Sequence, residues 1–352
     1  MKVVNYKCPN CAAGMRFDID TQLWLCQFCN SEFDVATLDR LASHEGNETP
    51  EADEIPAEEF AAQETAVYTC PDCGGRILTA CNTAATFCVY CHNPVVVAAH
   101  LQHEYKPAKI IPFKLKKEAA LEALNGICRK KPLLPRTFKQ AAKRGEITGL
   151  YVPFWLFSAN IYIAVTGTAR NVKSWTSGDY RHEKTDHFRI ARAATIPFEM
   201  VPVDGSLRMD NDLMDALEPF DCSQMMDFSM EYLSGFFAES YDEDATDCTL
   251  RFIERTDKAA LKYMQATLTG YTSTTLETID VRRMRMHNLY AILPVWVMNI
   301  KDGKNTYAFA MNGQTGKIAG NLPISAKRTA GWFGGLLILI VILTIIMARL
   351  FL

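Results

Sequence analysis

Eight cysteines in the first quarter of the chain have the type and spacing of metal ligands. They fall into two sets of four with one common pattern, Cys8, Cys11, Cys26 and Cys29, followed by Cys70, Cys73, Cys88 and Cys91. A CxxC turn presents two sulfur atoms to one ion, and two such turns complete the tetrahedral set of soft donors that zinc prefers. The spacing therefore predicts two zinc ribbons and two zinc ions per chain.

Two other uses of these cysteines have to be weighed. A four-cysteine site can hold iron in the manner of a rubredoxin electron carrier, and paired cysteines can form disulfides. Residues 1–6 lack the apolar segment of a secretory signal, which favours a reducing compartment where CxxC pairs bind metal. We expect zinc at both sites. The remaining cysteines are expected to be buried structural thiols: Cys81, Cys128, Cys222 and Cys248.

Each ribbon is too short to bury a hydrophobic core of its own. Metal binding would therefore supply most of its folding free energy, roughly 10 to 16 kcal/mol. Residues 1–42 are assigned to the first ribbon and residues 67–104 to the second. Between them, residues 43–66 contain eight acids, two prolines and no Lys or Arg, a composition typical of a disordered, solvated linker.

Residues 105–325 have the composition of an ordinary globular domain, and their patterns predict a mixed α+β fold. Helical spacing of apolar residues and runs of β-branched and aromatic residues locate the elements. Helices are predicted over 116–130, 137–144 and 213–217, and strands over 157–168, 196–203, 297–300 and 306–311. The segment 312–317 lacks the spacing of a phosphate loop and is predicted to be a turn.

A weak internal repeat runs through this domain. Residues 117–121 resemble residues 257–261, and residues 150–155 resemble residues 289–296 with a two-residue insertion. The repeat favours a domain built of two related helix-plus-strand units. Because the match is patchy, chance similarity is the second interpretation.

Charge is distributed in blocks although the net charge is only -3. Residues 106–144 carry twelve Lys and Arg, whereas residues 204–257 carry fifteen acids and three arginines. The basic block could contact the phosphates of nucleic acid or of anionic lipids, or it could be a solvated helix face. Net charge therefore excludes no class of partner.

The last segment reads as a membrane helix. Residues 332–348 contain no charge, and ten of these seventeen residues are Leu, Ile or Val. Extended to residue 352, the segment is about 31 Å long, enough for one crossing of a bilayer. Lys327 and Arg328 precede it and favour a cytosolic location for the preceding domain. We expect residues 326–352 to be a tail anchor, with a buried core helix as the alternative.

Catalytic signatures are missing from the sequence. It contains no Gly-rich phosphate loop, no GxSxG elbow and no HExxH pair, and His182 and His187 stand in a polar stretch without a nucleophile nearby. We therefore expect the protein not to be an enzyme.

Several motifs resemble a family of bacterial membrane-anchored zinc-ribbon proteins described as transcription-factor-IIB-type and sometimes labelled as a primosomal helicase. They are the CxxC pairs and the segments 149–155 (GLYVPFW), 232–241 (YLSGFFAESY) and 311–317 (MNGQTGK). The helicase label does not fit a chain without an ATP-binding motif. Some members are encoded with a flotillin-like (SPFH) protein and a phage-shock protein, so the resemblance implies recruitment of such partners during membrane stress.

Together these patterns predict a non-enzymatic adaptor on the cytoplasmic (inner) membrane. It would cross the bilayer once, keep the bulk of the chain in the cytosol and bind protein partners there. A nucleic-acid-binding protein of replication or transcription is the first alternative, and a rubredoxin-like electron carrier is the second.

Overall fold

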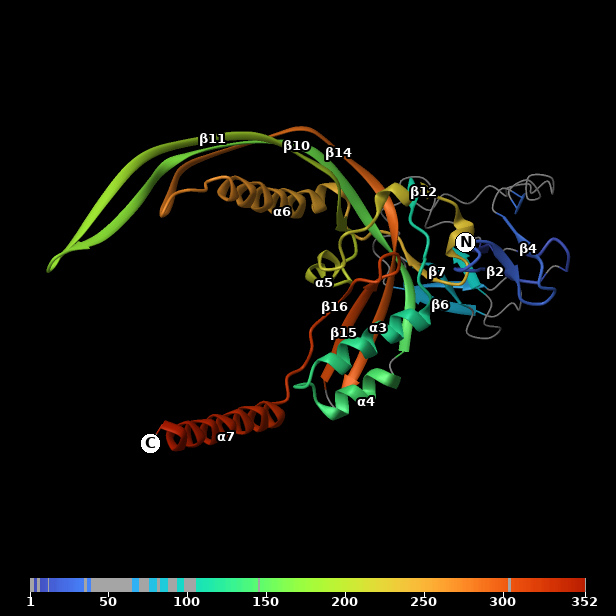
Figure 1. Ribbon diagram of the computed structural model, residues 1–352. Helices are drawn as coiled ribbons and strands as arrows, with labels where there is room; N and C mark the ends of the chain where they lie inside the picture. The colour runs from blue at the N-terminus through green and yellow to red at the C-terminus, as the bar shows by residue number, and fades with distance from the viewer. Residues whose placement is uncertain are drawn as a thin grey trace. The chain divides into compact units, whose positions relative to one another are not determined.

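The computed structural model describes residues 3–4, 7–11, 13–34, 37–38, 65–69, 76–80, 83–87, 94–97, 106–144, 146–302 and 305–351 (Figure 1). The chain separates into two compact units, each assembled from segments that are distant in the sequence. Unit 1 comprises Met1–Val152, Arg208–Ser240 and Ile292–Leu352, and unit 2 comprises Pro153–Leu207 and Tyr241–Ala291. The predicted mixed α+β class is confirmed.

Unit 1 contains a mixed sheet around an aromatic core. Its strands follow the order β1 (Val3–Val4), β8 (Pro94–Val97), β7 (Thr83–Phe87), β13 (Phe237–Glu239), β10 (Glu146–Ser177), β14 (Ser273–Asp302), β15 (Asn305–Asn312) and β16 (Ile318–Gly320), with only the first part of β10 and the last part of β14 in this unit. β9 (Lys109–Ile110) pairs with β12 (Met226–Asp227) and β14. In the core, the ring of Phe113 stacks on Phe236 at 4.3 Å and lies 4.9 Å from Trp296.

The other elements of unit 1 are short, except for the last helix. They are α3 (Lys117–Lys130), α4 (Arg136–Arg144), α5 (Asn211–Asp215), the 3-10 helices η3 (Cys222–Gln224) and η4 (Met230–Leu233), α7 (Ala326–Phe351), a sheet of β2 (Met15–Phe17), β3 (Trp24–Cys26) and β4 (Glu32–Phe33), and a pair of β5 (Thr65–Thr69) and β6 (Arg76–Ala80). α3 buries Ala120, Leu124 and Cys128 at four-residue spacing. Its sequence predicts a buried stripe of Leu121, Leu124 and Cys128, and Leu121 is only half-buried.

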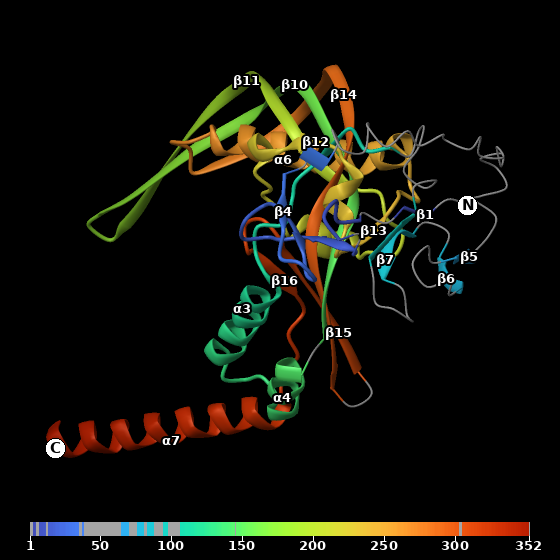
Figure 2. The same cartoon turned by 90° about the vertical axis from the view of Figure 1, so that its right-hand side faces the viewer.

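Unit 2 consists of a helix on a sheet of long strands. The remainder of β10 lies between β11 (Tyr180–Asp204) and the first part of β14, and α6 (Ala245–Ala266) packs on this sheet (Figures 1 and 2). Asp244 caps the start of α6 through a capping box with Asp247. The contact is apolar: Ile161, Ile163 and Val165 of β10 pack on Ala260 and Met264 of α6.

Most predicted elements are found, with different lengths. The predicted helices at 116–130 and 137–144 correspond to α3 and α4 within one residue, and the predicted turn at 312–317 joins β15 to β16. The predicted strand 157–168 is too short, because β10 runs from residue 146 to residue 177. The outer part of β10 is exposed on both faces and mostly polar, with Val172 and Trp175 as its only large apolar residues beyond residue 170, so its sequence carries no regular alternation of apolar and polar residues.

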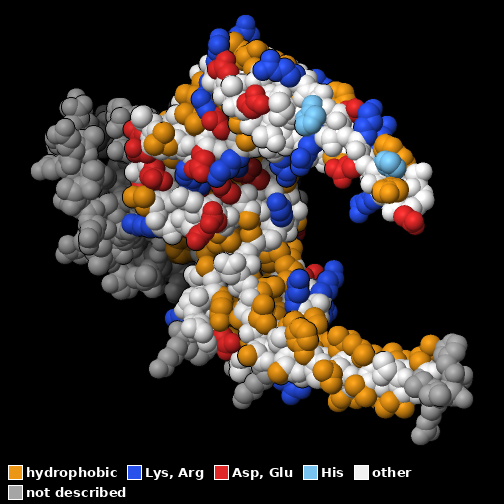
Figure 3. Space-filling view, turned by 90° about the vertical axis from the view of Figure 1, so that its left-hand side faces the viewer, with side chains coloured by type: hydrophobic (Ala, Val, Ile, Leu, Met, Phe, Trp, Pro, Cys, Tyr) orange, Lys and Arg blue, Asp and Glu red, His pale blue; other side chains and the backbone are white. Residues whose placement is uncertain are grey.

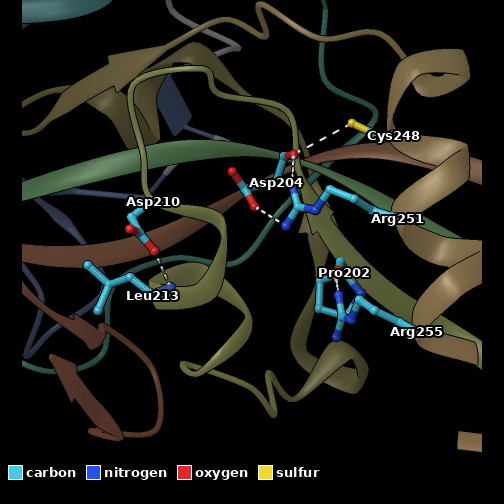
Figure 4. Close-up of polar contacts among 7 residues, drawn as sticks. All are labelled: Pro202, Asp204, Asp210, Leu213, Cys248, Arg251 and Arg255. Carbon is cyan, nitrogen blue, oxygen red and sulfur yellow. Dashed lines mark hydrogen bonds and ion pairs between the residues drawn. The ribbon is translucent and has the colours of Figure 1, made fainter. Parts of the chain in front are cut away.

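A buried ion pair joins α6 to the end of β11. The Asp204 side chain is fully buried, and its Oδ1 accepts a hydrogen bond from Arg251 Nη2 at 2.8 Å (Figure 4). Arg255 donates to the Pro202 carbonyl at 2.7 Å, and the Cys248 thiol donates to the Asp204 carbonyl at 3.5 Å. Burial raises the pKa of the Cys248 thiol to about 12, so this thiol stays protonated as a donor.

In unit 1, a set of backbone and tryptophan hydrogen bonds attaches α3 to β14 and β15. Gly313 N donates to the Pro294 carbonyl at 2.8 Å, and the Gly313 carbonyl accepts from Lys114 N and Leu115 N at 3.0 and 2.9 Å. The Trp296 indole N–H then donates to the Leu115 carbonyl at 2.8 Å. We call this set of four hydrogen bonds the glycine–tryptophan clamp.

Unit 2 contains a clamp of the same composition. Gly205 N donates to the Pro153 carbonyl at 3.0 Å, and the Gly205 carbonyl accepts from Asp242 N and Glu243 N at 2.8 and 3.1 Å. The Trp155 indole N–H donates to the Glu243 carbonyl at 3.0 Å. In each unit the carbonyl that accepts from tryptophan lies two residues before the helix, α3 or α6.

The two clamps agree with the strand half of the predicted sequence repeat, whereas the helix half of that repeat is wrong. Pro153 to Trp155 and Pro294 to Trp296 occupy the same places in the two clamps, as the predicted match of strands requires. The predicted match of helices is displaced, because residues 117–121 open α3 whereas residues 257–261 lie well inside α6.

Glycine is required at the centre of each clamp because another backbone or ring lies too close for a side chain. A Cβ at residue 205 would lie 2.9 Å from the Glu243 carbonyl oxygen, and one at residue 313 would lie 2.6 Å from the Phe113 ring. We therefore expect Gly205→Ala and Gly313→Ala each to lower the free energy of unfolding by about 1–3 kcal/mol. Gly126→Ala, in α3 with open space around it, should raise it by about 0.5–1 kcal/mol. Denaturant unfolding followed by tryptophan fluorescence measures all three variants.

The buried ion pair gives a second prediction. Arg251→Met removes a cationic partner of the buried Asp204 carboxylate and should destabilise unit 2 by about 3 kcal/mol. The matched control on the same helix is Lys258→Met, whose ion pair with Glu254 is solvent-exposed and should contribute less than about 0.5 kcal/mol. Hydrogen exchange of α6 reports both, and equal effects of the two variants would contradict the assignment.

Candidate metal centre

The sulfur atoms of Cys8, Cys11, Cys26 and Cys29 lie within 4.8 Å of one another. Two pairs are closer, with Sγ–Sγ distances of 3.5 Å between Cys8 and Cys29 and 3.4 Å between Cys11 and Cys26. An ion with four Zn–S bonds of about 2.3 Å would separate its ligands by about 3.8 Å at tetrahedral corners. The observed separations bracket that value, so these residues fit a four-coordinate thiophilic metal ion.

Two equivalent turns of the backbone present the four sulfurs. Cys8 N donates to the Ala13 carbonyl at 2.7 Å, and Cys26 N donates to the Ser31 carbonyl at 3.0 Å, so each turn is closed by the same hydrogen bond over five residues. The second turn also has Asn30 with a φ of 56°, directly after its last cysteine. Short strands β2, β3 and β4 hold these turns in place.

Hydrogen bonds make the four thiols electrostatically unequal. The side chain and backbone N–H of Ser31 stabilise the thiolate of Cys29 and lower its pKa to about 6. Asn10 fixes the Ser31 hydroxyl by donating to it at 2.8 Å. For Cys11, the backbone N–H of Ala13 lowers the pKa, but burial and the neighbouring thiols outweigh it and the pKa rises to about 12. Since a metal binds thiolates, loading this site releases protons.

The cysteine cluster is packed against the rest of unit 1. Ser234 Oγ donates to the Met15 carbonyl at 2.8 Å, and the Phe17 ring meets Tyr232 edge to face at 5.3 Å. Gly235 has a φ of 93°, and a Cβ there would lie 2.9 Å from Arg16 Cγ, so glycine allows this close approach. These contacts join the first cysteine cluster to the rest of unit 1.

A second contact lies on the other side of the same hairpin. Gln22 Nε2 donates to the Phe113 carbonyl at 3.1 Å, and Lys116 forms an ion pair with Asp20. Phe113 belongs to the aromatic core of unit 1 and Lys116 directly precedes α3. The metal-binding segment is therefore joined to the elements that the glycine–tryptophan clamp holds.

The other predicted cysteine sites have different outcomes. The second set, Cys70, Cys73, Cys88 and Cys91, lies outside the described residues, as do Cys81 and nearly all of the predicted acidic linker, so these stay predictions. Cys128 and Cys248 are buried as expected, whereas Cys222 is only half-buried. The described cysteines carry free thiols.

The predicted membrane segment forms one continuous helix. Among the described residues, the stretch Arg328–Met347 is the part long and apolar enough to span a bilayer, with a mean hydropathy of 2.5 and none of it buried by protein. Figure 3 shows hydrophobic side chains along its visible face. At its start, Arg328 Nη1 donates to the carbonyls of Pro132 and Leu134 at 2.9 and 2.7 Å, which ties α7 to the loop before α4.

Comparison with known proteins identifies a relative that matches almost the whole chain. A Bacillus subtilis (strain 168) protein described as "Uncharacterized protein YdjG" is 33% identical over 334 residues, which cover 95% of this chain and 94% of that protein. The chain belongs to the YdjG family. The shared length is too great to be a match of the cysteine segments alone. No protein-family model matches the chain, and no solved structure matches it.

Loss of one ligand should affect more than the ribbon. Cys11→Ser leaves three thiolates for the metal, and we expect this variant to lose the ion and unfold residues 7–34. Because Ser234 and Tyr232 pack on this segment, hydrogen exchange at residues 230–236 should also accelerate. Cys222→Ser, outside the cluster, serves as the control. Retained metal by elemental analysis, or unchanged exchange at 230–236, would contradict the coupling.

Proposed function

We propose that this protein is a non-enzymatic adaptor that is anchored in a membrane by α7 and recruits protein partners through zinc-ribbon surfaces. The observation that carries the proposal is the exposure of α7. From Trp332 to Met347 every residue except Gly334, Gly335 and Thr344 has a large apolar side chain that is at least 47% exposed, and such a helix cannot remain uncovered in water. A lipid bilayer is the environment that matches its length and composition.

Zinc is the metal that we propose for the site. Four thiolates at tetrahedral spacing suit both zinc and iron, but a zinc site of this kind is structural, whereas an iron site would carry electrons. The packing of the cluster against Ser234 and Tyr232 supports a structural role. We propose a second zinc ion at Cys70, Cys73, Cys88 and Cys91 on the spacing of those residues alone.

We infer that the domain-bearing side of the membrane is the cytosol and that the membrane is the cytoplasmic one. Lys327 and Arg328 lie in the first turn of α7, before its apolar stretch, and positive residues at the end of a membrane segment favour retention of that end in the cytosol. Zinc thiolates also require a reducing environment, since oxidation to disulfides would release the ion.

The exposed side of the metal cluster provides a surface for a partner. Phe28 lies between Cys26 and Cys29, and its side chain is 82% exposed. The hydrogen bonds of the turn fix the backbone that carries this ring, and an exposed aromatic on a fixed backbone is a typical anchor of a protein interface. The resemblance to transcription-factor-IIB-type zinc-ribbon proteins implies that the partner is a flotillin-like (SPFH) or phage-shock protein.

We also infer that the two units derive from one duplicated helix-plus-strand element. The two glycine–tryptophan clamps support this, because four hydrogen bonds recur between equivalent atoms and each is built on a Pro-x-Trp segment. The residue before the clamp glycine is also similar in the two units: a buried Asp204 precedes Gly205, and a buried Asn312 precedes Gly313. Independent origin would have to reproduce all of these features.

The anchor is tested by truncation and protease protection. Ending the chain before Gly331 should move the protein from the membrane fraction to the soluble fraction, whereas Trp332→Ala, which keeps the apolar length, should leave it membrane-bound. Protease added to intact spheroplasts should leave units 1 and 2 uncut. Digestion of either unit under these conditions would overturn the proposed orientation.

Recruitment is tested at the exposed knuckle. Phe28→Ala should retain the metal, because Phe28 is not a ligand, but should delocalise a tagged flotillin-like or phage-shock partner from the membrane. The control is Gln27→Ala in the same turn. Unchanged partner localisation in Phe28→Ala and in a chain lacking residues 1–104, together with ATP hydrolysis or DNA unwinding by the intact protein, would reject the adaptor proposal.

A further inference from the structure

Strands β10 and β11 extend beyond α6 as a two-stranded ribbon, residues 171–187 (Figure 1). The last contacts of β10 with the segment after α6 are hydrogen bonds to Thr272. The Arg170 carbonyl and Asn171 Oδ1 each accept from Thr272 N at 2.9 Å, and Val172 N donates to the Thr272 hydroxyl. Every residue from 173 to 185 is exposed. The strands are closed by Gly178, with a φ of 58°, and Asp179. An isolated two-stranded ribbon is marginally stable, so a surface that covers it would stabilise it.

The register places the aromatic and basic side chains of the ribbon on one face. Lys173 pairs with Lys184, Trp175 with His182 and Ser177 with Tyr180. Because side chains alternate along a strand, these three pairs share a face, which we call the basic-aromatic face. The Trp175 and His182 rings stack at 5.4 Å, as neighbours on one face can. The opposite face carries the pairs Ser174 with Glu183 and Thr176 with Arg181.

The basic-aromatic face continues the side of the sheet that packs on α6. The only register shift in the β10–β11 pairing lies at Phe157 and Ala159, so alternation is unbroken from Ile161 outward. Ile161 and Ile163 face α6, and Trp175 therefore projects from the same side, past the end of the helix. Here the ring has no helix to cover it and is 51% exposed, and Tyr180 at the turn is 74% exposed. Figure 3 shows hydrophobic, histidine and Lys or Arg side chains at the free end of this hairpin, together with Asp or Glu side chains.

We propose that the basic-aromatic face of the ribbon binds the surface of an anionic lipid bilayer, as a membrane contact separate from α7. Trp and Tyr have an apolar ring with a polar edge and are the residues that settle at the headgroup level of a membrane. Lys173 and Lys184 flank them and attract anionic headgroups. Among the acids of the ribbon, Glu183 lies on the opposite face and Asp179 lies in the turn. Asp186 pairs with Asn171 on the basic-aromatic face and forms an ion pair with Lys184 at 3.1 Å, which offsets part of the charge of that lysine. Lys173 therefore contributes most of the attraction.

Lipid fits this face better than nucleic acid does. A single-stranded nucleic acid also combines phosphates with stacking bases, but it needs an aromatic ring with an open face. The His182 ring covers one face of Trp175, so this residue offers a single ring face to a base, whereas its indole edge remains available to lipid headgroups. The same chain also contains a helix that can span a bilayer, and a membrane tether raises the effective concentration of lipid at any other surface of the protein.

The experiment is hydrogen exchange of the full chain reconstituted into vesicles of phosphatidylcholine alone or with 30% phosphatidylglycerol. About one-third anionic lipid gives a negatively charged surface, at which each nearby lysine raises the binding affinity about fivefold. We expect residues 171–187 to exchange more slowly in the anionic vesicles. Trp175→Ala with Tyr180→Ala should abolish this protection, and Lys173→Gln with Lys184→Gln should lower it by about fivefold per lysine.

Matched controls are placed on the opposite face of the same ribbon. Ser174→Ala with Thr176→Ala should keep the lipid-dependent protection, and normal exchange of α6 in every variant shows that unit 2 remains folded. The proposal is overturned if protection is the same in neutral vesicles or if it survives in the Trp175 and Tyr180 variant. It is also overturned if protection rises with protein concentration and not with anionic lipid, or if an oligonucleotide protects the ribbon in place of lipid. Resistance of the protein to alkaline extraction tests α7 separately, so failure of the anchor is distinguishable from failure of the ribbon.

Discussion

Attachment of each helix to its strand depends on one backbone arrangement, the carbonyl of a glycine that accepts two N–H groups. Gly313 receives Lys114 and Leu115, and Gly205 receives Asp242 and Glu243. At both positions the neighbouring segments approach so closely that the distances leave no room for a Cβ, so glycine is required there. The tryptophan indole N–H then donates to the carbonyl that lies two residues before the helix. Without this bond, that carbonyl would lose its contact with water and have no hydrogen-bond partner.

This arrangement explains why both units are discontinuous in sequence. The helix of unit 1 precedes β10 in the chain but is bonded through Trp296 of β14, while the helix of unit 2 precedes β14 but is bonded through Trp155 of β10. Each helix is therefore bonded to the other long strand and not to the long strand that follows it in the chain. Neither half of the domain contains a complete set of these contacts by itself, so the two parts of the chain must fold together.

The metal centre is linked to the same arrangement in unit 1. The cysteine hairpin contacts Phe113, Lys116, Tyr232 and Ser234. Those residues precede α3 or surround the core ring Phe236, so the position of the hairpin and the packing of the core depend on one another. Binding energy of a metal at the four sulfurs would therefore stabilise unit 1 as well as the hairpin. A structural metal centre with this linkage gives Phe28 a fixed position relative to unit 1, which is what a recruitment surface requires.

Several features of this protein are determined by the sequence alone. The spacing of Cys8, Cys11, Cys26 and Cys29 predicts their convergence, since ligand type and separation are local properties of two turns. The apolar run of α7 and the helical stripe of α3 are similarly local, because they need only a periodic pattern of side chains. Other features were decided by tertiary structure. The docking of the cysteine hairpin and the bonding of each helix to its strand depend on contacts between residues 88 to 219 positions apart. Neither composition nor periodicity carries a signal for such contacts. The length of β10 was also decided there, because its outer residues are mostly polar and exposed on both sides and are held as a strand by pairing with β11.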